Sequence, residues 1–271
     1  MSRPRQSHAV HHHYVRYPVT VAERFWALIV GPLFVCVLIY AVILLFPAAP
    51  RGEAVTLTTI FAATLATLVR IAVAYAFAIL FAVPLALLVE WNATVESFLL
   101  PIFDVFESIP NLAILPVILV FFLQIHFLEG AALTILFLNM VWNIVFALVG
   151  GLKVIPRDVK DAAHVFGLRG FSYLRRLILP AIFPQFITGS ILAVASGWNI
   201  IIVAEALHAY LPAGAAPQDL FGVGSVLVSA SANGQSQTYI TAFVVMVVVI
   251  ALFNFFVWQK LLNYSQRFRF E

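Results

Sequence analysis

Four ionisable residues lie in or beside apolar stretches of the sequence, at Arg70, Asp104, Glu107 and Glu205. A charged side chain at the centre of a bilayer costs roughly 2.5–3.5 kcal/mol, so each of them requires a physical reason. Asp104 and Glu107 are three residues apart and share one helical face, which is the spacing of a carboxylate pair for acid–base chemistry. No metal-ligating histidine accompanies them. We therefore expect a contact with a polar loop, or a helix cap near Pro110, rather than catalysis.

Glu205 has two interpretations, because it follows an apolar run near the end of a helix. It is either a gate or pathway residue, or an interfacial carboxylate that faces water. Asn199 lies about two turns earlier and could form a polar stripe with it. The role of Arg70 also has several interpretations. Its side chain could attract anions along a path, pair with a carboxylate, or reach lipid headgroups at the outer surface.

Two prolines interrupt a third apolar run, at Pro110 and Pro116. Proline removes a backbone donor, and broken helices in transporters often border the substrate cavity, although a simple kink is an equal alternative. Pro110, Pro116, Asn199 and Glu205 are therefore the candidate pathway residues. No metal site is expected, because no two of His126, His164 and His208 share ligand spacing on one element.

The composition defines the elements that must position these residues. Hydrophobic residues make up 63% of the 271-residue chain and charged residues only 10%, with a mean hydropathy of +1.03. Soluble domains are nearer ~45–50% apolar and ~25% charged. The chain is therefore an integral membrane protein, which excludes a water-soluble enzyme, a disordered chain and a nucleic-acid binder. The single cysteine, Cys36, rules out a disulfide within the chain.

We predict an all-α fold with about six transmembrane helices, because about 20 apolar residues cross the hydrocarbon core. The second span carries an interfacial lead-in over 55–68, and Gly222 and Gly224 permit a re-entrant or surface helix in the last outer loop. The predicted spans cover 27–46, 69–88, 99–123, 130–152, 187–207 and 239–262. They form a transmembrane domain over 27–262, between an N-terminal tail (1–26), for which no signal-peptide cleavage site is apparent, and a C-terminal tail (263–271).

The basic residues orient these spans. Of the 15 Lys and Arg residues, 13 lie before the first span, within 153–186 or after the sixth span, whereas Arg51 alone lies between the first two spans and Arg70 is near or within the second. The positive-inside rule then places both termini and the 153–186 loop in the cytoplasm. The outer loop over 208–237 contains no Lys or Arg.

The cytoplasmic loop has its own pattern. Pro156 ends the fourth helix, Asp158 caps the next, and Gly167 ends that short helix before a second one over 171–179 that stops at Pro180. The first short helix presents a small, flat face, which suits docking into a groove on another protein. That face carries Ala162, Ala163 and, further along, Phe166.

This loop resembles the EAA loop of ABC-importer permeases, which reads Glu-Ala-Ala, three residues, Gly, nine residues, Ile, one residue, Leu-Pro. The spacing fits at every position, with Asp161 in place of Glu and Leu177 in place of Ile. The matching residues, which the resemblance implies to be the ATPase-coupling loop, are Asp161, Ala162, Ala163, Gly167, Leu177, Leu179 and Pro180. Segments 67–89, 108–122 and 197–207 also resemble the branch that imports nitrate, sulfonates and taurine.

The resemblance implies a type I (MetI-like) permease subunit of the bacterial plasma membrane, not an enzyme. It implies a second permease chain, expected to be identical, two ATPase subunits that hold ATP and Mg²⁺, and an extracytoplasmic substrate-binding protein. No cofactor is expected on this chain, which lacks the G-x-x-x-x-G-K-[ST] pattern. A small anion such as nitrate, a sulfonate, taurine or bicarbonate is the expected substrate.

Two other functions were weighed. A secondary transporter driven by an ion gradient would typically show internal repeats and midplane carboxylates, and neither is visible in the sequence. A membrane-embedded enzyme would need a clustered nucleophile or a His-rich motif, and none is apparent. The secondary transporter remains the alternative to the ABC importer.

Overall fold

The computed structural model describes residues 55–91, 93–210 and 219–268, and all of the regular structure in these ranges is helical. The predicted first span over 27–46 and the N-terminal tail lie outside these residues. The α-helices are α2 (Leu57–Trp91), α3 (Ala93–Ser108), α4 (Asn111–Gln124), α5 (Leu128–Val154), α6 (Arg157–Val165), α7 (Gly170–Tyr173), α8 (Leu179–Glu205), α9 (Val223–Ala232), α10 (Ser236–Phe253) and α11 (Gln259–Ser265). Short π-helical turns η1 (Leu174–Ile178) and η3 (Asn254–Trp258), and 3₁₀ turns η2 (Leu207–Tyr210) and η4 (Gln266–Phe268), extend or link them.

Four helical stretches in the described residues are long and apolar enough to cross a membrane: 57–90, 128–154, 170–205 and 236–268. A fifth crossing is formed if α3 and α4, which meet at an angle of 85°, count as one broken span. Together with the predicted span at 27–46, this agrees with an all-helical, multi-pass fold of about six spans.

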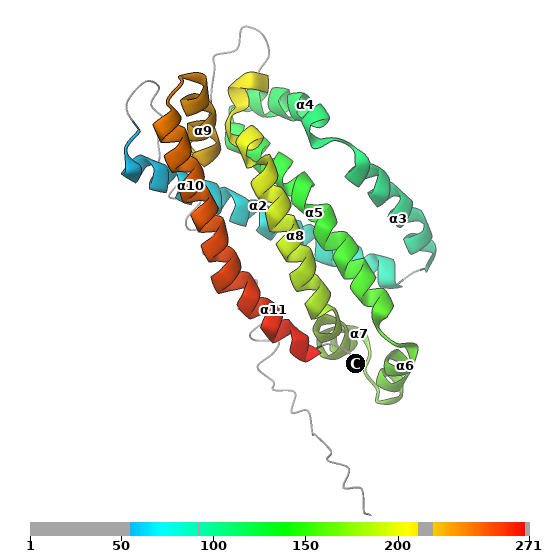
Figure 1. Ribbon diagram of the computed structural model, residues 1–271. Helices are drawn as coiled ribbons and strands as arrows, with labels where there is room; N and C mark the ends of the chain where they lie inside the picture. Colours follow the sequence, from blue (N-terminus) through cyan, green and yellow to red (C-terminus); the bar gives the residue numbers. More distant parts are fainter. Residues whose placement is uncertain (1–54, 92, 211–218, 269–271) are drawn as a thin grey trace, which may run out of the picture.

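The predicted lead-in over 55–68 is not a separate element, because α2 is one uninterrupted helix of 35 residues. No glycine interrupts it, and its single internal proline, Pro84, comes late. At 1.5 Å per residue it extends about 50 Å, well beyond the ~30 Å of the hydrocarbon core. A bilayer can accommodate a helix of this length if the helix tilts, and α2 runs obliquely across α5, α8 and α10 (Figure 1).

The third predicted span is broken at Pro110, one of the prolines predicted to interrupt it. Pro110 stands at the junction of α3 and α4 in an extended conformation, with φ −60° and ψ 118°. Proline cannot donate a backbone hydrogen bond and disfavours the helical conformation of the residue before it, here Ile109. Pro116, by contrast, remains inside α4.

Pro180 does not stop a helix, contrary to the prediction from the sequence. The chain is helical without interruption from Gly170 to Glu205, because the turn before Pro180 widens into the π-helical η1. There the amide of Leu179 donates to the carbonyl of Leu174, five residues back. The wider turn accommodates the proline, which has no N–H to donate.

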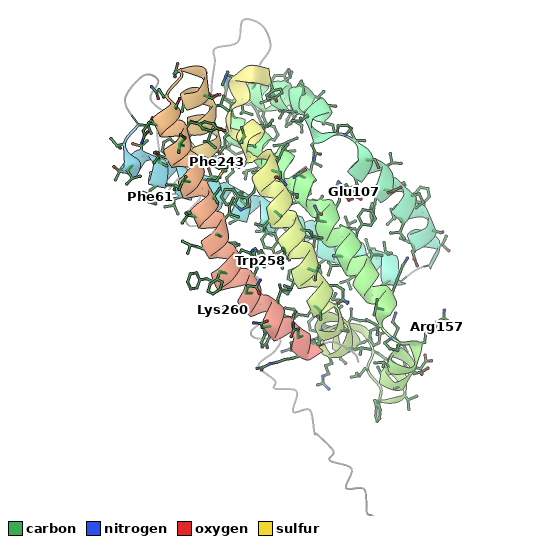
Figure 2. All side chains as sticks on the ribbon, viewed as in Figure 1. Phe61, Glu107, Arg157, Phe243, Trp258 and Lys260 are labelled. Atoms are coloured by element: carbon green, nitrogen blue, oxygen red, sulfur yellow. The ribbon has the colours of Figure 1, made fainter. Side chains whose placement is uncertain are left out.

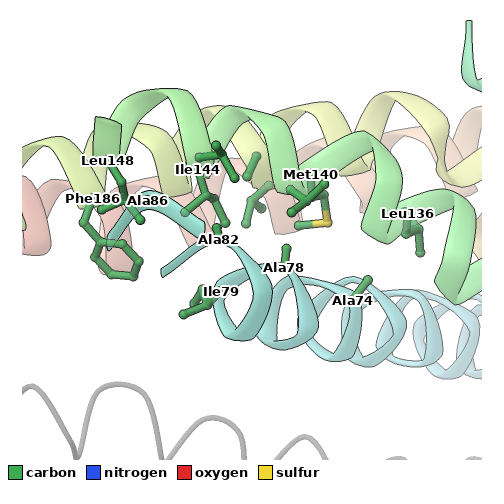
Figure 3. Packing of buried hydrophobic residues seen from close by; sticks show 14 of the residues in the cluster. Ala74, Ala78, Ile79, Ala82, Ala86, Leu136, Met140, Ile144, Leu148 and Phe186 are labelled. Atoms are coloured by element: carbon green, nitrogen blue, oxygen red, sulfur yellow. The ribbon is translucent and has the colours of Figure 1, made fainter. Parts of the chain in front are cut away.

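Small residues hold the long helices together. A stripe of alanines on α2 meets large apolar side chains of α5, and each of these residues is at most 1% exposed (Figure 3). Helices in a bilayer gain little from the hydrophobic effect, so close packing on such small residues is a main source of their association. The stripe consists of Ala74, Ala78, Ala82 and Ala86, and its partners include Leu136, Met140, Ile144 and Leu148.

The two ends of the bundle differ in charge. The ends of α5 and α11, together with α6 and α7, lie at one end, and α4 and α9 lie at the other (Figure 1). Apart from Arg70, every Lys and Arg of the described residues belongs to segments 153–176 or 260–267, at the first end. Arg157 and Lys260 lie toward this basic end, whereas Phe61 and Phe243 lie toward the opposite one (Figure 2).

Candidate functional site

The basic loop between α5 and α8 contains the predicted helix–glycine turn. Helix α6 ends in a Schellman motif, in which the amide of Leu168 donates to the Ala163 carbonyl at 2.9 Å and that of Gly167 to the His164 carbonyl at 3.0 Å. Gly167 has a φ of +76°, which favours glycine. The predicted cap is different, since Pro156 occupies the N-cap and Asp158 lies in the first turn without a side-chain capping bond.

The loop exposes large apolar side chains rather than the predicted alanine face. Val165 is 85% exposed, Phe166 84% and Phe171 67%, and we call these three residues the apolar tip. Ala162 is exposed but Ala163 packs inside, at 6% exposure. The predicted flat face is therefore divided, with one alanine turned inward. Asp161 is exposed as well, whereas the motif's last three residues lie partly buried along η1 and the start of α8, at Leu177, Leu179 and Pro180.

Two ion pairs join this loop to the neighbouring spans. Lys160 of α6 pairs with Glu90 in the last turn of α2, and Lys153 of α5 pairs with Glu96 of α3 at 2.7 Å. The Lys160–Glu90 pair is partly buried, with 24% and 18% of the two side chains exposed. A displacement of α6 would therefore pull on the basic end of α2.

A buried ion cluster lies at the other end of the bundle. Arg70 of α2 forms a bidentate pair with Glu129 of α5, with Nε–Oε2 and Nη2–Oε1 distances of 2.8 and 2.7 Å. Its remaining nitrogen, Nη1, donates to Glu205 at the end of α8. Arg70 is 2% exposed and Glu205 is fully buried. The interpretation of Glu205 as a carboxylate that faces water is therefore wrong, and Arg70 lies in a structural ion pair rather than at the surface.

Glu205 also holds the N-terminus of α9. Its Oε2 accepts from the amide of Gly224 at 2.7 Å, and its Oε1 accepts from Thr67 Oγ1 at the same distance. A negative charge is favourable at a helix N-terminus, where free amides and the helix dipole point toward it. The approach is close, since a Cβ atom built at Gly222 would lie 2.2 Å from the Glu205 carboxyl carbon. The predicted helix near Gly222 and Gly224 is confirmed, and the cluster anchors it.

A polar hollow of about 440 Å³ opens between α3, α5 and α8. Glu107 lies on its α3 side (Figure 2), so the contact with a loop or cap expected for this residue is wrong. Asp104, one turn earlier, is exposed and does not line the hollow. The lining residues are Glu107, Asn143, Phe146, Ala147, Pro184, Gln185, Thr188 and Leu192.

Next to the hollow, hydrogen bonds of asparagine side chains link the three helices α4, α5 and α8. Asn111 Nδ2 of α4 donates to Asn139 Oδ1 of α5 at 2.7 Å, and Asn139 Nδ2 donates to the Ser196 carbonyl of α8 at 2.6 Å. Asn143 Nδ2 reaches Ser196 Oγ at 3.2 Å. Reasoning from the sequence missed these residues, although Asn139 and Asn143 are spaced four apart in an apolar span and would have marked one polar face.

The four predicted pathway residues are not brought together. Pro110 lies at the α3–α4 break, Pro116 inside α4, and Glu205 in the buried cluster. Asn199 is exposed on α8, so it does not share a stripe with Glu205. It lies eleven residues, close to three full turns, beyond Thr188 and therefore on the same face of α8 as the hollow. Within the described ranges no three His, Cys, Asp or Glu side chains gather as a metal site.

Comparison with known proteins gives a family match over residues 78–263, more than half of the chain, to a model described as the inner membrane component of binding-protein-dependent transport systems. The chain is 29% identical over 208 residues to a nitrate import permease protein of Leptolyngbya laminosa, covering 77% of this chain and 67% of the relative. It is 32% identical over 163 residues to a bicarbonate transport system permease protein of Synechococcus elongatus, covering 60% and 57%. A taurine transport system permease protein of Escherichia coli is 27% identical over 144 residues, with 53% and 51% covered.

The family match and the apolar helical spans identify a multi-pass transport permease of the inner membrane. The chain belongs to the family of binding-protein-dependent transport system inner membrane components, and it is a type I ABC-importer permease subunit. The alignments with these three relatives span between about half and two thirds of the relatives' own lengths.

Proposed function

We propose that two copies of this chain form the membrane pore of an ATP-driven importer, and that residues 157–180 of each copy dock on a separate ATPase subunit. The ATPase subunits would bind ATP and Mg²⁺. The observation that carries the proposal is the apolar tip at the basic end of the bundle. By the positive-inside rule this end, with both termini, faces the cytoplasm.

The apolar tip supports docking because the bilayer cannot cover it there. Phe166 and Val165 are more than four fifths exposed on a segment rich in Lys and Arg, which belongs outside the hydrocarbon core. Contiguous apolar side chains exposed to water mark interaction sites. A groove on a partner protein that receives a short helix and the turn after it would bury both.

Coupling would follow from the way the loop is attached. The Schellman turn at Gly167 sets the direction of the chain after α6, so it fixes how the apolar tip is presented. The ion pair between Lys160 and Glu90 would pass a displacement of α6 to α2. ATP-driven closure of the ATPase pair would then draw the two loops together and open the pore outward.

The remaining parts of the proposal concern substrate and delivery. An extracytoplasmic binding protein would present the solute at the end of the bundle that carries α9 and the outer loop over 208–237. Relatives are named for nitrate, bicarbonate and taurine, so we take the substrate to be a small acid or its anion.

The proposal is tested by purifying the tagged chain in mild detergent from its own host and identifying the proteins that accompany it. Gly167→Asp should lose the ATPase, because the substitution strains a residue at φ +76° and adds a charge beside the apolar tip. Gly234→Asp is the matched control, since Gly234 also has a positive φ, of +65°, with open space around it, but lies after α9 at the opposite end.

A Walker-type ATPase present with the wild type and Gly234→Asp, and depleted with Gly167→Asp, supports the docking proposal. Equal recovery with Gly167→Asp would show that the loop is not the docking site. Absence of any ATPase from the wild type would favour the alternative, a secondary transporter.

A further inference from the structure

We propose that the polar hollow between α3, α5 and α8 binds the protonated amine of the transported solute, so that the substrate is a small acid that also carries an amine. This inference rests on the proposed import function and narrows its substrate class. It depends on Glu107 and on the hydrogen-bonding capacity of the residues around it.

Glu107 is a carboxylate at membrane depth without a cation beside it. Glu96, near the start of α3, pairs with Lys153 at the basic end, and Glu107 lies eleven residues, or about 16 Å, further along the helix. No Lys, Arg or His of the described chain forms an ion pair with it. A charge at this depth is costly, and such residues usually mark a pathway for substrate or ions.

The other polar groups of the hollow offer acceptors. Asn143 uses Nδ2 to donate to the Asn139 carbonyl, which fixes the orientation of its amide and leaves Oδ1 available. Thr188 donates its hydroxyl to the Pro184 carbonyl at 3.1 Å, so its oxygen can still accept. Gln185 Oε1 is buried and has no hydrogen-bond partner among the described residues.

Three acceptors are open to the hollow, on Glu107, Asn143 and Thr188, and together they carry one negative charge, so they favour a donor that carries positive charge. A protonated amine supplies three N–H donors and would neutralise Glu107, whereas nitrate or bicarbonate would bring a second negative charge into a region of low dielectric. Arg70 cannot balance that charge, because it is already shared between Glu129 and Glu205. The volume of about 440 Å³ lies within the ~300–1,000 Å³ usual for small-molecule sites.

The test measures binding to the permease, with whatever ATPase accompanies it, in lipid nanodiscs and without a binding protein. Calorimetry compares two pairs of solutes that differ by the amine: taurine with ethanesulfonate, and glycine with acetate, with nitrate added alone. Glu107→Gln is the test variant. Asp104→Asn is its control, because Asp104 lies one turn away on α3, outside the hollow.

We expect the amine-bearing member of at least one pair to bind the wild type and Asp104→Asn about ten-fold more tightly than its partner, the difference typical of one charge-assisted hydrogen bond. Glu107→Gln should abolish that preference. No preference for the amine in either pair, tighter binding of nitrate, or a preference that survives Glu107→Gln would overturn the inference. The ATPase content of the same preparation tests the proposed function separately. If no ATPase is present, the binding of the solutes to the permease can still be measured and interpreted.

Discussion

At the scale of single residues, the ion cluster shows how this chain keeps charges inside a membrane bundle. One guanidinium is shared by two carboxylates, and the buried carboxylate of Glu205 also accepts hydrogen bonds from Thr67 and from the amide of Gly224. Every polar atom that Arg70 and Glu205 bring into the bundle thus has a partner. Removing one member of such a buried ion pair strongly destabilises a protein, because the other charge is left without its partner.

Arg70→Met should destabilise the protein strongly, by about 3–5 kcal/mol, because it leaves Glu205 buried without its cation. Heating the detergent-solubilised protein, followed by size-exclusion chromatography of what remains folded, measures the loss. The double variant Arg70→Met/Glu205→Gln should recover part of it, since one uncompensated charge is removed. Wild-type stability of Arg70→Met would contradict the role given to the cluster.

The cluster was not predictable from the sequence in hand. Arg70 and Glu205 are 135 residues apart, and periodicity within one helix carries no information about a partner on another. The sequence placed Arg70 and Glu205 beside apolar runs and offered an ion pair among the interpretations of Arg70, but it did not single out Glu129. It could not choose, because that choice depends on how α2 and α8 cross.

At the scale of the elements, close helix contacts depend on positions where no side chain fits. Gly189 of α8 faces α5, where a Cβ atom would lie 2.5 Å from Ala147 Cβ and 3.0 Å from the Asn143 carbonyl oxygen. One wall of the polar hollow is built at this same contact, by Asn143 and Ala147 of α5 and Thr188 of α8. The spacing between α5 and α8 therefore sets both the stability of the bundle and the shape of the hollow.

Gly189→Ala should lower stability by roughly 1–3 kcal/mol, the usual cost of overpacking a tight contact. Gly150→Ala is the matched control in α5, since nothing lies within 4 Å of the added methyl group and alanine favours a helix. Thermal inactivation of both variants in the same detergent makes the comparison. Equal stability of the two would show that α5 and α8 can separate at no cost.

The sequence predicted an element correctly where the length of the apolar run and the residues at its ends indicated the same helix. Helix α5, Leu128–Val154, matches the span predicted over 130–152, and Gly167 ends α6 as expected. The errors arise where the packing of whole helices outweighs the preference of a single residue or the expected length of a span. Pro180 is absorbed by a π-helical turn, and α2 continues through the predicted lead-in because a tilted helix can exceed the bilayer thickness.

At the scale of the whole molecule, charge divides the bundle into a basic end and an opposite end whose one Arg or Lys among the described residues is the buried, paired Arg70. The proposed function places the ATPase subunits at the basic end and the binding protein at the other end. The polar hollow lies between the two ends, on a face formed by α3, α5 and α8.

The orientation predicts which residues a membrane-impermeant thiol reagent reaches in intact cells. With Cys36 replaced by serine, Ser231→Cys at the end of α9 should be labelled from outside, because it is exposed at the end proposed to face outward. Arg157→Cys on α6 should be labelled only after the membrane is opened. The reverse pattern would invert the topology and remove the ATPase proposal with it.

The mass of the intact wild-type assembly, measured by native mass spectrometry from mild detergent, tests the central claim most directly. The account predicts a complex with two copies of this 29.9-kDa chain and two ATPase subunits. A stable species that contains this chain without any ATPase, under each of several gentle extractions, would contradict it.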